Sequence, residues 1–272
     1  MRFAIAFLLM TRICFGQDAR SIVERAVAAW DRHDRLMLDY TYKARNEIRE
    51  LDSAGRVKSD HSTVDEVMYI GGKRFFRPLE KDGKPLPAAQ EKSEEAKLER
   101  AAREAGRLSD AEHEQRIEDA EQDRLKRREQ FRGIPDAYDL KLVGETPIEG
   151  RKTWEILATP RPAYRGKFGG LFRNIEGKLW IDEQDFEWTK VEAEVLDNFS
   201  LGWFLARVNK GTHISFEMTR VNDELWAPGH FSLTASARIA LMKKINAEQD
   251  VTFSDYRKFR TDSRIVSSGD GP

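Results

Sequence analysis

The hydrophobic pattern near the start of the chain changes from the period of a helix to that of a strand. Over 18–33, apolar residues recur at intervals of three and four, which predicts an amphipathic helix capped by Asp18. From Leu36 onward, apolar and polar residues alternate, which is typical of a strand with one buried face and one solvated face. The apolar side of this expected strand begins with Leu36, Leu38, Tyr40 and Tyr42.

The same alternation returns along the rest of the chain. It is found in 138–142, 154–158, 191–195, 214–218 and 231–241. Glycine-bearing pairs, each expected to form a turn, lie between such runs: Ala54-Gly55, Gly71-Gly72, Asp82-Gly83, Glu149-Gly150, Glu176-Gly177 and Lys210-Gly211. The order predicts a mainly β fold with some α-helix, in which long strands form an antiparallel sheet curved into a half-barrel behind an N-terminal helix.

Residues 88–132 interrupt the strand pattern. This segment holds 13 acidic and 11 basic side chains in 45 positions, with Phe131 as its one aromatic residue. Ser109 and Glu112 have the spacing of a capping box, which predicts that a second helix begins there. We expect an inserted, charged helical hairpin that projects into solvent. Its charge pattern favours a solvated excursion, and a docking arm for a protein partner is the alternative.

The first sixteen residues resemble a targeting segment. Arg2 precedes an apolar run, and small residues come just before Gln17, which predicts a signal peptide over 1–16 and export of the remaining chain. Cys14 is the one cysteine, so the mature chain would form no disulfide, and a bacterial envelope location fits better than a disulfide-stapled secreted scaffold. We expect one domain over 17–262, interrupted by 88–132, and a flexible tail over 263–272.

Composition and motifs exclude several classes of function. The 46 basic and 47 acidic residues leave a net charge of −1, which offers no general attraction for nucleic acid. A mean hydropathy of −0.65 excludes a polytopic membrane protein. No nucleophile elbow, phosphate-binding loop or histidine pair is present, so the sequence predicts no enzyme, no metal and no cofactor. The hypothesis of a hydrolase whose catalytic residues are far apart in the sequence is kept, and it ranks below the others.

A glycine-rich loop over 159–173 combines cations and aromatic rings without an acidic residue. One interpretation is a crossover whose aromatic rings pack on the sheet. The other is a mobile rim, because arginine pairs with phosphate while aromatic rings supply apolar contact. The rim candidates are Arg161, Tyr164, Arg165, Phe168 and Phe172.

Three strings of residues resemble a known family. Trp154 to Pro160 is similar to a strand that ends on a Thr-Pro turn, Leu179 to Asp182 to the hairpin after it, and Trp226 to Pro228 to the C-terminal part of the family of LolA/LolB-like lipoprotein carriers. The closest branch is the outer-membrane lipoprotein-sorting-like proteins, and the resemblance covers roughly 17–85 and 136–262. It implies a half-barrel whose concave apolar face, covered by helices, holds acyl chains.

These observations favour a periplasmic, non-enzymatic protein that binds the acyl chain of a lipid or lipoprotein. The alternative is an envelope sensor or scaffold that binds a protein partner through the 88–132 hairpin. The apolar face is either a dry core or a ligand cavity, and the pattern does not decide which. The residues expected to face a cavity are Leu36, Leu38, Tyr40, Tyr42, Trp154, Ile156, Phe231, Leu233 and Ala235.

Overall fold

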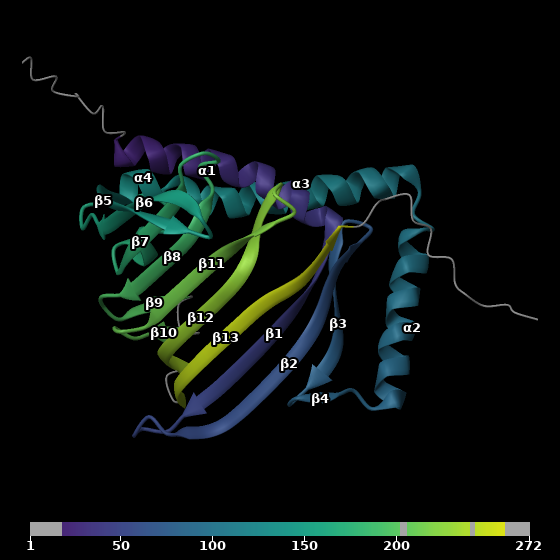
Figure 1. Ribbon diagram of the computed structural model, residues 1–272. Helices are drawn as coiled ribbons and strands as arrows, with labels where there is room; N and C mark the ends of the chain where they lie inside the picture. Colours follow the sequence, from purple (N-terminus) through teal and green to yellow (C-terminus); the bar gives the residue numbers. More distant parts are fainter. Residues whose placement is uncertain (1–17, 202–205, 240–242, 259–272) are drawn as a thin grey trace, which may run out of the picture.

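The computed structural model describes residues 18–201, 206–239 and 243–258 (Figure 1). The predicted signal peptide and the predicted tail lie outside these described residues. The helices are α1 (Ala19–Leu36), a 3-10 helix (Met37–Asp39), α2 (Ala88–Ala105), α3 (Asp110–Arg132), α4 (Ile134–Ala137) and α5 (Gly169–Phe172). The strands are β1 (Tyr40–Leu51), β2 (Val57–Ile70), β3 (Lys73–Lys81), β4 (Lys84–Pro85), β5 (Tyr138–Ile148), β6 (Arg151–Pro160), β7 (Ile175–Asp182), β8 (Trp188–Val195), β9 (Phe199–Leu201), β10 (Ala206–Val208), β11 (His213–Val221), β12 (Leu225–Ile239) and β13 (Lys243–Lys258).

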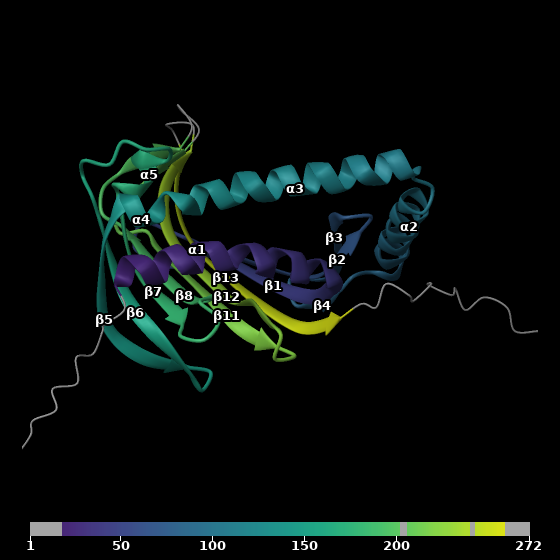
Figure 2. The ribbon, with the colours of Figure 1, turned by 90° about the horizontal axis from the view of Figure 1, so that it is seen from above.

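The strands form one antiparallel sheet that is open at both edges. The order is β4-β3-β2-β1-β13-β12-β11-β8-β7-β6-β5, with β10 paired to β12 and β9 paired to β10. The sheet curves strongly around α1 (Figure 2). The expected fold class, a mainly β half-barrel with an N-terminal helix, is therefore confirmed. The first strand pairs with the last, so strands from the two ends of the sequence meet in the middle of the sheet.

Two-residue turns join several neighbouring strands. Asp82 and Gly83 have φ angles of 51° and 71°, and Glu149 and Gly150 have φ angles of 48° and 77°. Positive φ at both central residues twists the turn in the sense that the flanking strands require, and glycine takes it up at little cost. The turn predicted at Glu176-Gly177 is wrong, because both residues lie inside β7.

The first strand also begins later than its alternation predicts. The N-terminal helix continues to Leu36, and a 3-10 helix follows over Met37–Asp39, so β1 starts at Tyr40. Leu36 and Leu38 therefore lie on helical turns outside the strand. A run of a few residues fits a strand or the last turns of a helix equally well, and packing decides between the two.

Residues 88–132 form two helices, as expected, and Ser109 and Glu112 make the predicted capping box. The prediction that this hairpin projects into solvent is only partly correct, because most of its residues are exposed but both helices also contact the rest of the fold. Its two helices connect β4 and β5, which are the opposite edges of the sheet. The first helix, α2, lies against β2 and β3, and α3 packs on α1, where the rings of Trp30 and Phe131 stack at 4.4 Å (Figures 1 and 2).

Because α2 and α3 connect opposite edges of the sheet, any linker that replaces residues 88–132 must be long enough to span the same distance. The 23 residues of α3 span about 35 Å at the rise of an α-helix. A flexible linker of about six residues in place of 88–132 reaches at most ~20 Å. We expect that variant to lose cooperative unfolding in urea, because β4 and β5 cannot both reach their edges.

A Gly/Ser linker of about 30 residues has a root-mean-square span of ~30 Å and extends much further. We expect this longer replacement to unfold cooperatively, at reduced stability because Phe131 is lost. Cooperative unfolding of the six-residue variant would show that the two edges do not depend on the crossover.

The main core lies between α1 and the β5–β8 part of the sheet. The helix contributes Ile22, Val23 and Ala26, each at most 1% exposed. Trp188 of β8 is 5% exposed, and its Nε1–H donates a hydrogen bond of 3.1 Å to the carbonyl of Ala26. The apolar stripe of the helix and the apolar face of the sheet thus remove each other from water.

Candidate binding site

The part of the sheet beneath α1 is a filled core. The strand register aligns Leu142 with Ile156, Ile156 with Leu179, and Leu179 with Val191. Directly opposed residues of antiparallel strands project their side chains from the same face. Ile156 and Leu179 are 0% and 5% exposed and pack against the residues of α1. This part of the apolar face is therefore packed against α1.

The same row continues beyond the helix onto strands that are less well covered. Val191 aligns with Phe216, Phe216 with Phe231, and in the neighbouring row Ile214 aligns with Leu233. These side chains are only half-buried. Since alternate residues of a strand share a face, Ala235 lies on this face too. We call Ile214, Phe216, Phe231, Leu233 and Ala235 the open apolar face.

The arrangement of the helices explains the half-burial. The main contacts of α1 with strands are to β5, β7 and β12, and those of α2 are to β2 and β3. In Figure 1, α1 and α3 lie across one end of the sheet, and the long strands extend well beyond them. Because α1 crosses the strands near one end (Figure 1), it does not cover their full length, and apolar side chains of β11 and β12 remain partly accessible to solvent.

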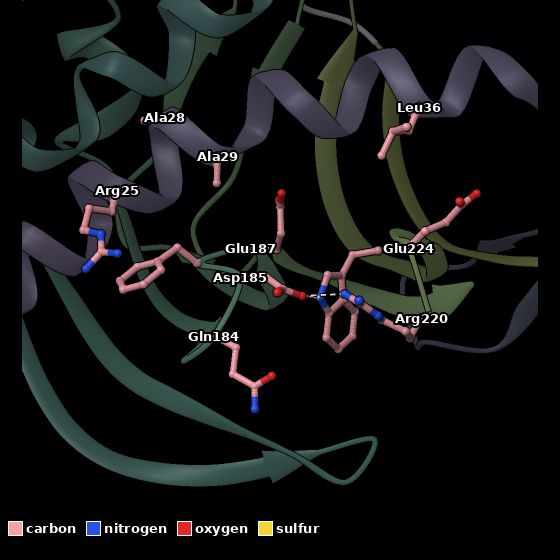
Figure 3. A pocket seen from close by; sticks show the side chains of 11 residues that line it. Arg25, Ala28, Ala29, Leu36, Gln184, Asp185, Glu187, Arg220 and Glu224 are labelled. Carbon is pink, nitrogen blue, oxygen red and sulfur yellow. Dashed lines mark hydrogen bonds and ion pairs between the residues drawn. The ribbon is translucent and has the colours of Figure 1, made fainter. Parts of the chain in front are cut away.

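A cleft of about 670 Å³ runs along the flank of α1 (Figure 3). One wall consists of residues of α1, namely Arg25, Ala28, Ala29 and Leu36. The other comes from the β7–β8 turn and the β11–β12 hairpin, namely Gln184, Asp185, Phe186, Glu187, Arg220, Glu224 and Trp226. The cleft therefore combines a helix wall that is apolar apart from Arg25 with an opposite wall that carries most of the charged groups and two aromatic rings.

A network of ion pairs holds the polar wall in place. Arg151 makes a bidentate contact with Asp182, with both N–O distances 2.6 Å, and lies 3.0 Å from Asp185. Arg220 donates to Asp185 from the other side at 2.5 Å. The indole Nε1–H of Trp226 donates to the same carboxylate at 3.3 Å. Asp185 is thus surrounded by donors that also pin the β11–β12 hairpin to the β7–β8 turn.

Asp182 is the buried anchor of this network, at 0% exposure. Burial by itself would raise the pKa of Asp182, but hydrogen bonds from Arg151 and from the backbone N–H groups of Asp185 and Gln184 outweigh it and hold the pKa below its ordinary value. Its oxygen accepts these backbone bonds at 2.8 and 2.9 Å, so the carboxylate also shapes the turn. These charges are paired with one another, which makes the network a structural element.

Arg25 also lines the cleft, but it does not belong to this ion-pair network. Its guanidinium carbon lies 3.4 Å from the ring centroid of Phe186, whose backbone has a φ of 59°. Within the part of the chain that the structure describes, Arg25 has no ion pair with a carboxylate. Stacking leaves the N–H edges of a guanidinium available for hydrogen bonds in its plane.

The residues expected to face a cavity divide into five groups. Leu36 lines the cleft, whereas Leu38 is 46% exposed on the 3-10 helix. Tyr40 and Tyr42 are 1% and 5% exposed in a second core that also contains Met37. Leu36 and Leu38 thus lie on helical turns. Tyr40 and Tyr42 lie in a packed core, because the 3-10 helix and the β11–β12 hairpin pack around the start of β1.

The remaining candidates lie on the two halves of the sheet face. Trp154 and Ile156 are buried in the core beneath α1. Phe231, Leu233 and Ala235 belong to the open apolar face and are half-buried. The alternation placed all five on one face correctly, and the position of α1 separates the filled part from the open part.

The glycine-rich loop is only partly a rim. Tyr164 and Phe172 pack against the main core, and Arg161 forms an ion pair of 2.7 Å with Asp139. Arg165 and Phe168 are exposed, with Phe168 in the left-handed region at a φ of 60°. The interpretation in which the aromatic rings pack on the sheet is therefore correct for Tyr164 and Phe172.

Several residues of the cleft and of the ion-pair network behind its wall were not candidates from the sequence. Asp182, Asp185, Arg151 and Arg220 come from three separate hairpins, and in a chain with 47 acidic and 46 basic residues a charged pair near a turn carries little signal. Asp182 and Trp226 entered the sequence analysis only as members of the family-like strings. Arg220 and Trp226 are six positions apart in the sequence and become neighbours only through the register of β11 with β12.

Comparison with known proteins gives distant structural likenesses. The sequence matches no protein-family model and no curated protein. A solved domain described as an outer membrane lipoprotein-sorting protein from Vibrio parahaemolyticus is similar at 11% identity over 89% of this chain and 95% of that chain, with a TM-score of 0.35. A DUF1329 family protein from Desulfovibrio piger is similar at 12% identity, covering 89% and 93%, with a TM-score of 0.32. A LolA superfamily protein from Nitrosomonas europaea is similar at 11% identity, covering 89% and 93%, with a TM-score of 0.27.

Two of these three names belong to the group that the sequence strings resemble. At these identities and TM-scores, the likeness carries no conclusion about ligand or activity. Within the described residues, no helix is both long enough and apolar enough to cross a membrane.

Proposed function

We propose that this protein is a periplasmic, non-enzymatic binder of the acyl chain of a lipid or lipoprotein. The observation that carries the proposal is the open apolar face. Five side chains from β11 and β12 continue the apolar face of the main core, yet lie half-buried beyond the helix that covers that core. The expected signal peptide and the family-like strings support the compartment and the ligand class.

The physical argument rests on the shape and chemistry of this face. Phe216 and Phe231 are neighbours across two strands, and Ile214 and Leu233 lie beside them. Apolar surface removed from water contributes about 25 cal/mol per Å², and a flexible chain can lie along such a row without any specific polar contact. A curved sheet adds walls on both sides of the row, which suits a linear apolar ligand better than a flat partner.

A tryptophan at position 235 should block this face. Ala235 is half-buried beside Ala247, so the larger ring has room to project over the open apolar face. We expect Ala235→Trp to weaken the binding of a fluorescent fatty-acid probe about tenfold or more, with a change in unfolding free energy below ~1 kcal/mol. Probe titration and the thermal midpoint should be measured on the same preparations.

Thr234→Trp is the matched control. Thr234 is exposed and adjacent in the strand, so its side chain projects from the opposite face. We expect that variant to bind the probe as the parent does. A loss of about 1–3 kcal/mol in Ala235→Trp, with no probe binding even in the parent, would indicate an overpacked dry core and reject the proposal.

A second candidate function is supported by the surface of α3. Ile117 and Leu125 are 70% and 41% exposed on this helix. Such side chains on a highly charged crossover fit a scaffold or sensor that binds an envelope protein. A partner captured by the parent and lost in Ile117→Glu, with fatty-acid binding unchanged, would favour this function.

A further inference from the structure

The face that carries the open apolar residues becomes polar on the neighbouring strands. The row through Phe231 continues to Val251 of β13, Asn46 of β1 and Thr63 of β2. The row through Leu233 continues to Gln249 and then to Ile48. One row further along, Ala44 aligns with Asp65 of β2. We call Asn46, Thr63, Asp65 and Gln249 the polar strip.

Most oxygen and nitrogen atoms of the strip face one another. The Nε2–H of Gln249 donates to Oδ1 of Asn46 at 2.8 Å. The hydroxyl of Thr63 lies 3.4 Å from Oδ2 of Asp65, which is a long contact for a hydroxyl donor. Since neighbouring strands are about 4.8 Å apart, Asn46 lies ~10 Å across the sheet from Phe231.

Asp65 differs from the carboxylates around it. Glu66, the next residue, projects from the other face and forms an ion pair of 2.6 Å with Arg77, and Glu80 forms one of 3.3 Å with Arg45. Asp65 is half-buried, and within the described residues its one polar side-chain contact is Thr63. Burial raises the pKa of Asp65, with the Thr63 hydroxyl acting in the other direction.

An unpaired, half-buried carboxylate beside an apolar face is costly in the free protein. A cation that binds beside it would regain part of that free energy through charge-assisted hydrogen bonds. A carboxylate or phosphate in the same place would instead add a like charge. The other members of the strip offer amide and hydroxyl oxygens, which are acceptors for an ammonium group.

On this basis, and resting on the proposed function, we propose that the polar strip binds the head group of the amphiphile whose acyl chain lies on the open apolar face, and that this head group carries a primary amine. The carboxylate of Asp65 and the side-chain oxygens of Asn46 and Thr63 accept hydrogen bonds from the ammonium. An amine head group therefore distinguishes the preferred ligand from a fatty acid of equal chain length.

The experiment compares head groups at constant chain length. Dodecylamine, dodecanol and dodecanoate each compete with a fluorescent acyl probe on the full chain. We expect dodecylamine to bind about tenfold more tightly than dodecanoate, as one charge-assisted hydrogen bond predicts, with dodecanol between them.

Asp65→Asn tests the residue itself, because it keeps the shape and removes the charge. We expect this variant to lose about tenfold in dodecylamine binding and to leave dodecanol binding unchanged. Asp60→Asn is the matched control, since Asp60 is an exposed acid of the same strand on the opposite face. Its dodecylamine binding should equal that of the parent, and thermal midpoints should confirm that both variants fold.

The possible outcomes separate the two proposals. If dodecanoate binds as tightly as dodecylamine, or if Asp65→Asn loses no amine binding, the amine inference is overturned while acyl binding stands. If none of the three compounds displaces the probe, the proposed function itself fails. A fourth competitor, lysophosphatidylethanolamine, distinguishes the source of the amine: displacement that depends on Asp65 assigns it to a phospholipid head group, and its absence assigns it to a simple long-chain amine.

Discussion

Replacing Trp188 by alanine is expected to lower the free energy of unfolding by about 3–5 kcal/mol, the usual cost of deleting a buried aromatic side chain. The indole is 5% exposed in the main core, between β8 and α1. Its Nε1–H also donates to the carbonyl of Ala26 in the middle of α1. The variant therefore loses the packing of a large ring and one of the polar contacts that fix the helix on the sheet.

Urea unfolding followed by circular dichroism measures this loss, and Trp188→Phe is the matched variant. It keeps most of the apolar volume but removes the N–H and part of the ring, so we expect a cost of about 1–2 kcal/mol. The difference between the two variants then reports mainly the packing of the remaining ring. A cost below ~1 kcal/mol for alanine would contradict the tight packing of α1 on this part of the sheet.

Replacing Asp182 by asparagine should cost about 3 kcal/mol, because removal of one partner leaves the other member of a buried ion pair uncompensated. Asp182 is fully buried, while Arg151 keeps part of its side chain in solvent, at 23% exposure. The same carboxylate accepts two backbone N–H groups of its own turn. The variant should therefore loosen both the β7–β8 turn and the wall of the cleft.

The effect of Asp182 should depend on pH in a defined direction. Its pKa is lowered in the folded protein, so its stabilising contribution is fully present above the ordinary aspartate pKa of about 3.9 and is lost as the pH falls through the lower folded value. The difference between parent and Asp182→Asn in urea unfolding should be constant near neutral pH and shrink below ~4. Asp60 is exposed, so Asp60→Asn should have nearly the same unfolding free energy as the parent both near neutral pH and below ~4. A parent–variant difference that grows on acidification would contradict the assigned direction.

The two halves of the sheet face relate to the proposed function in different ways. The core beneath α1, with Ile156 fully buried, supplies stability and holds the curvature of the sheet. The open apolar face on β11 and β12 lies beyond that helix and is only half-buried, and it is the face that we propose binds the acyl chain. Variants in the first half should act mainly on unfolding, and variants in the second mainly on binding.

Local sequence determined much of the secondary structure. The helix beginning at Ala19, the long strands and the two-residue turns at Asp82-Gly83 and Glu149-Gly150 follow from period and from backbone preference alone. The capping box at Ser109 likewise needs only residues three apart. Each of these signals is contained within a few residues, so the sequence is sufficient to reveal it.

Tertiary structure decided what lies far apart in the chain. The pairing of β1 with β13, and the route of α2 and α3 from one edge of the sheet to the other, depend on which distant strands meet. The ion pair between Arg151 and Asp182 joins residues 31 positions apart, and no local pattern marks it. Whether Ile156 is in a dry core and Phe231 on an open face depends on where α1 lies across the sheet, because both residues have the same alternation and only the helix removes one of them from water.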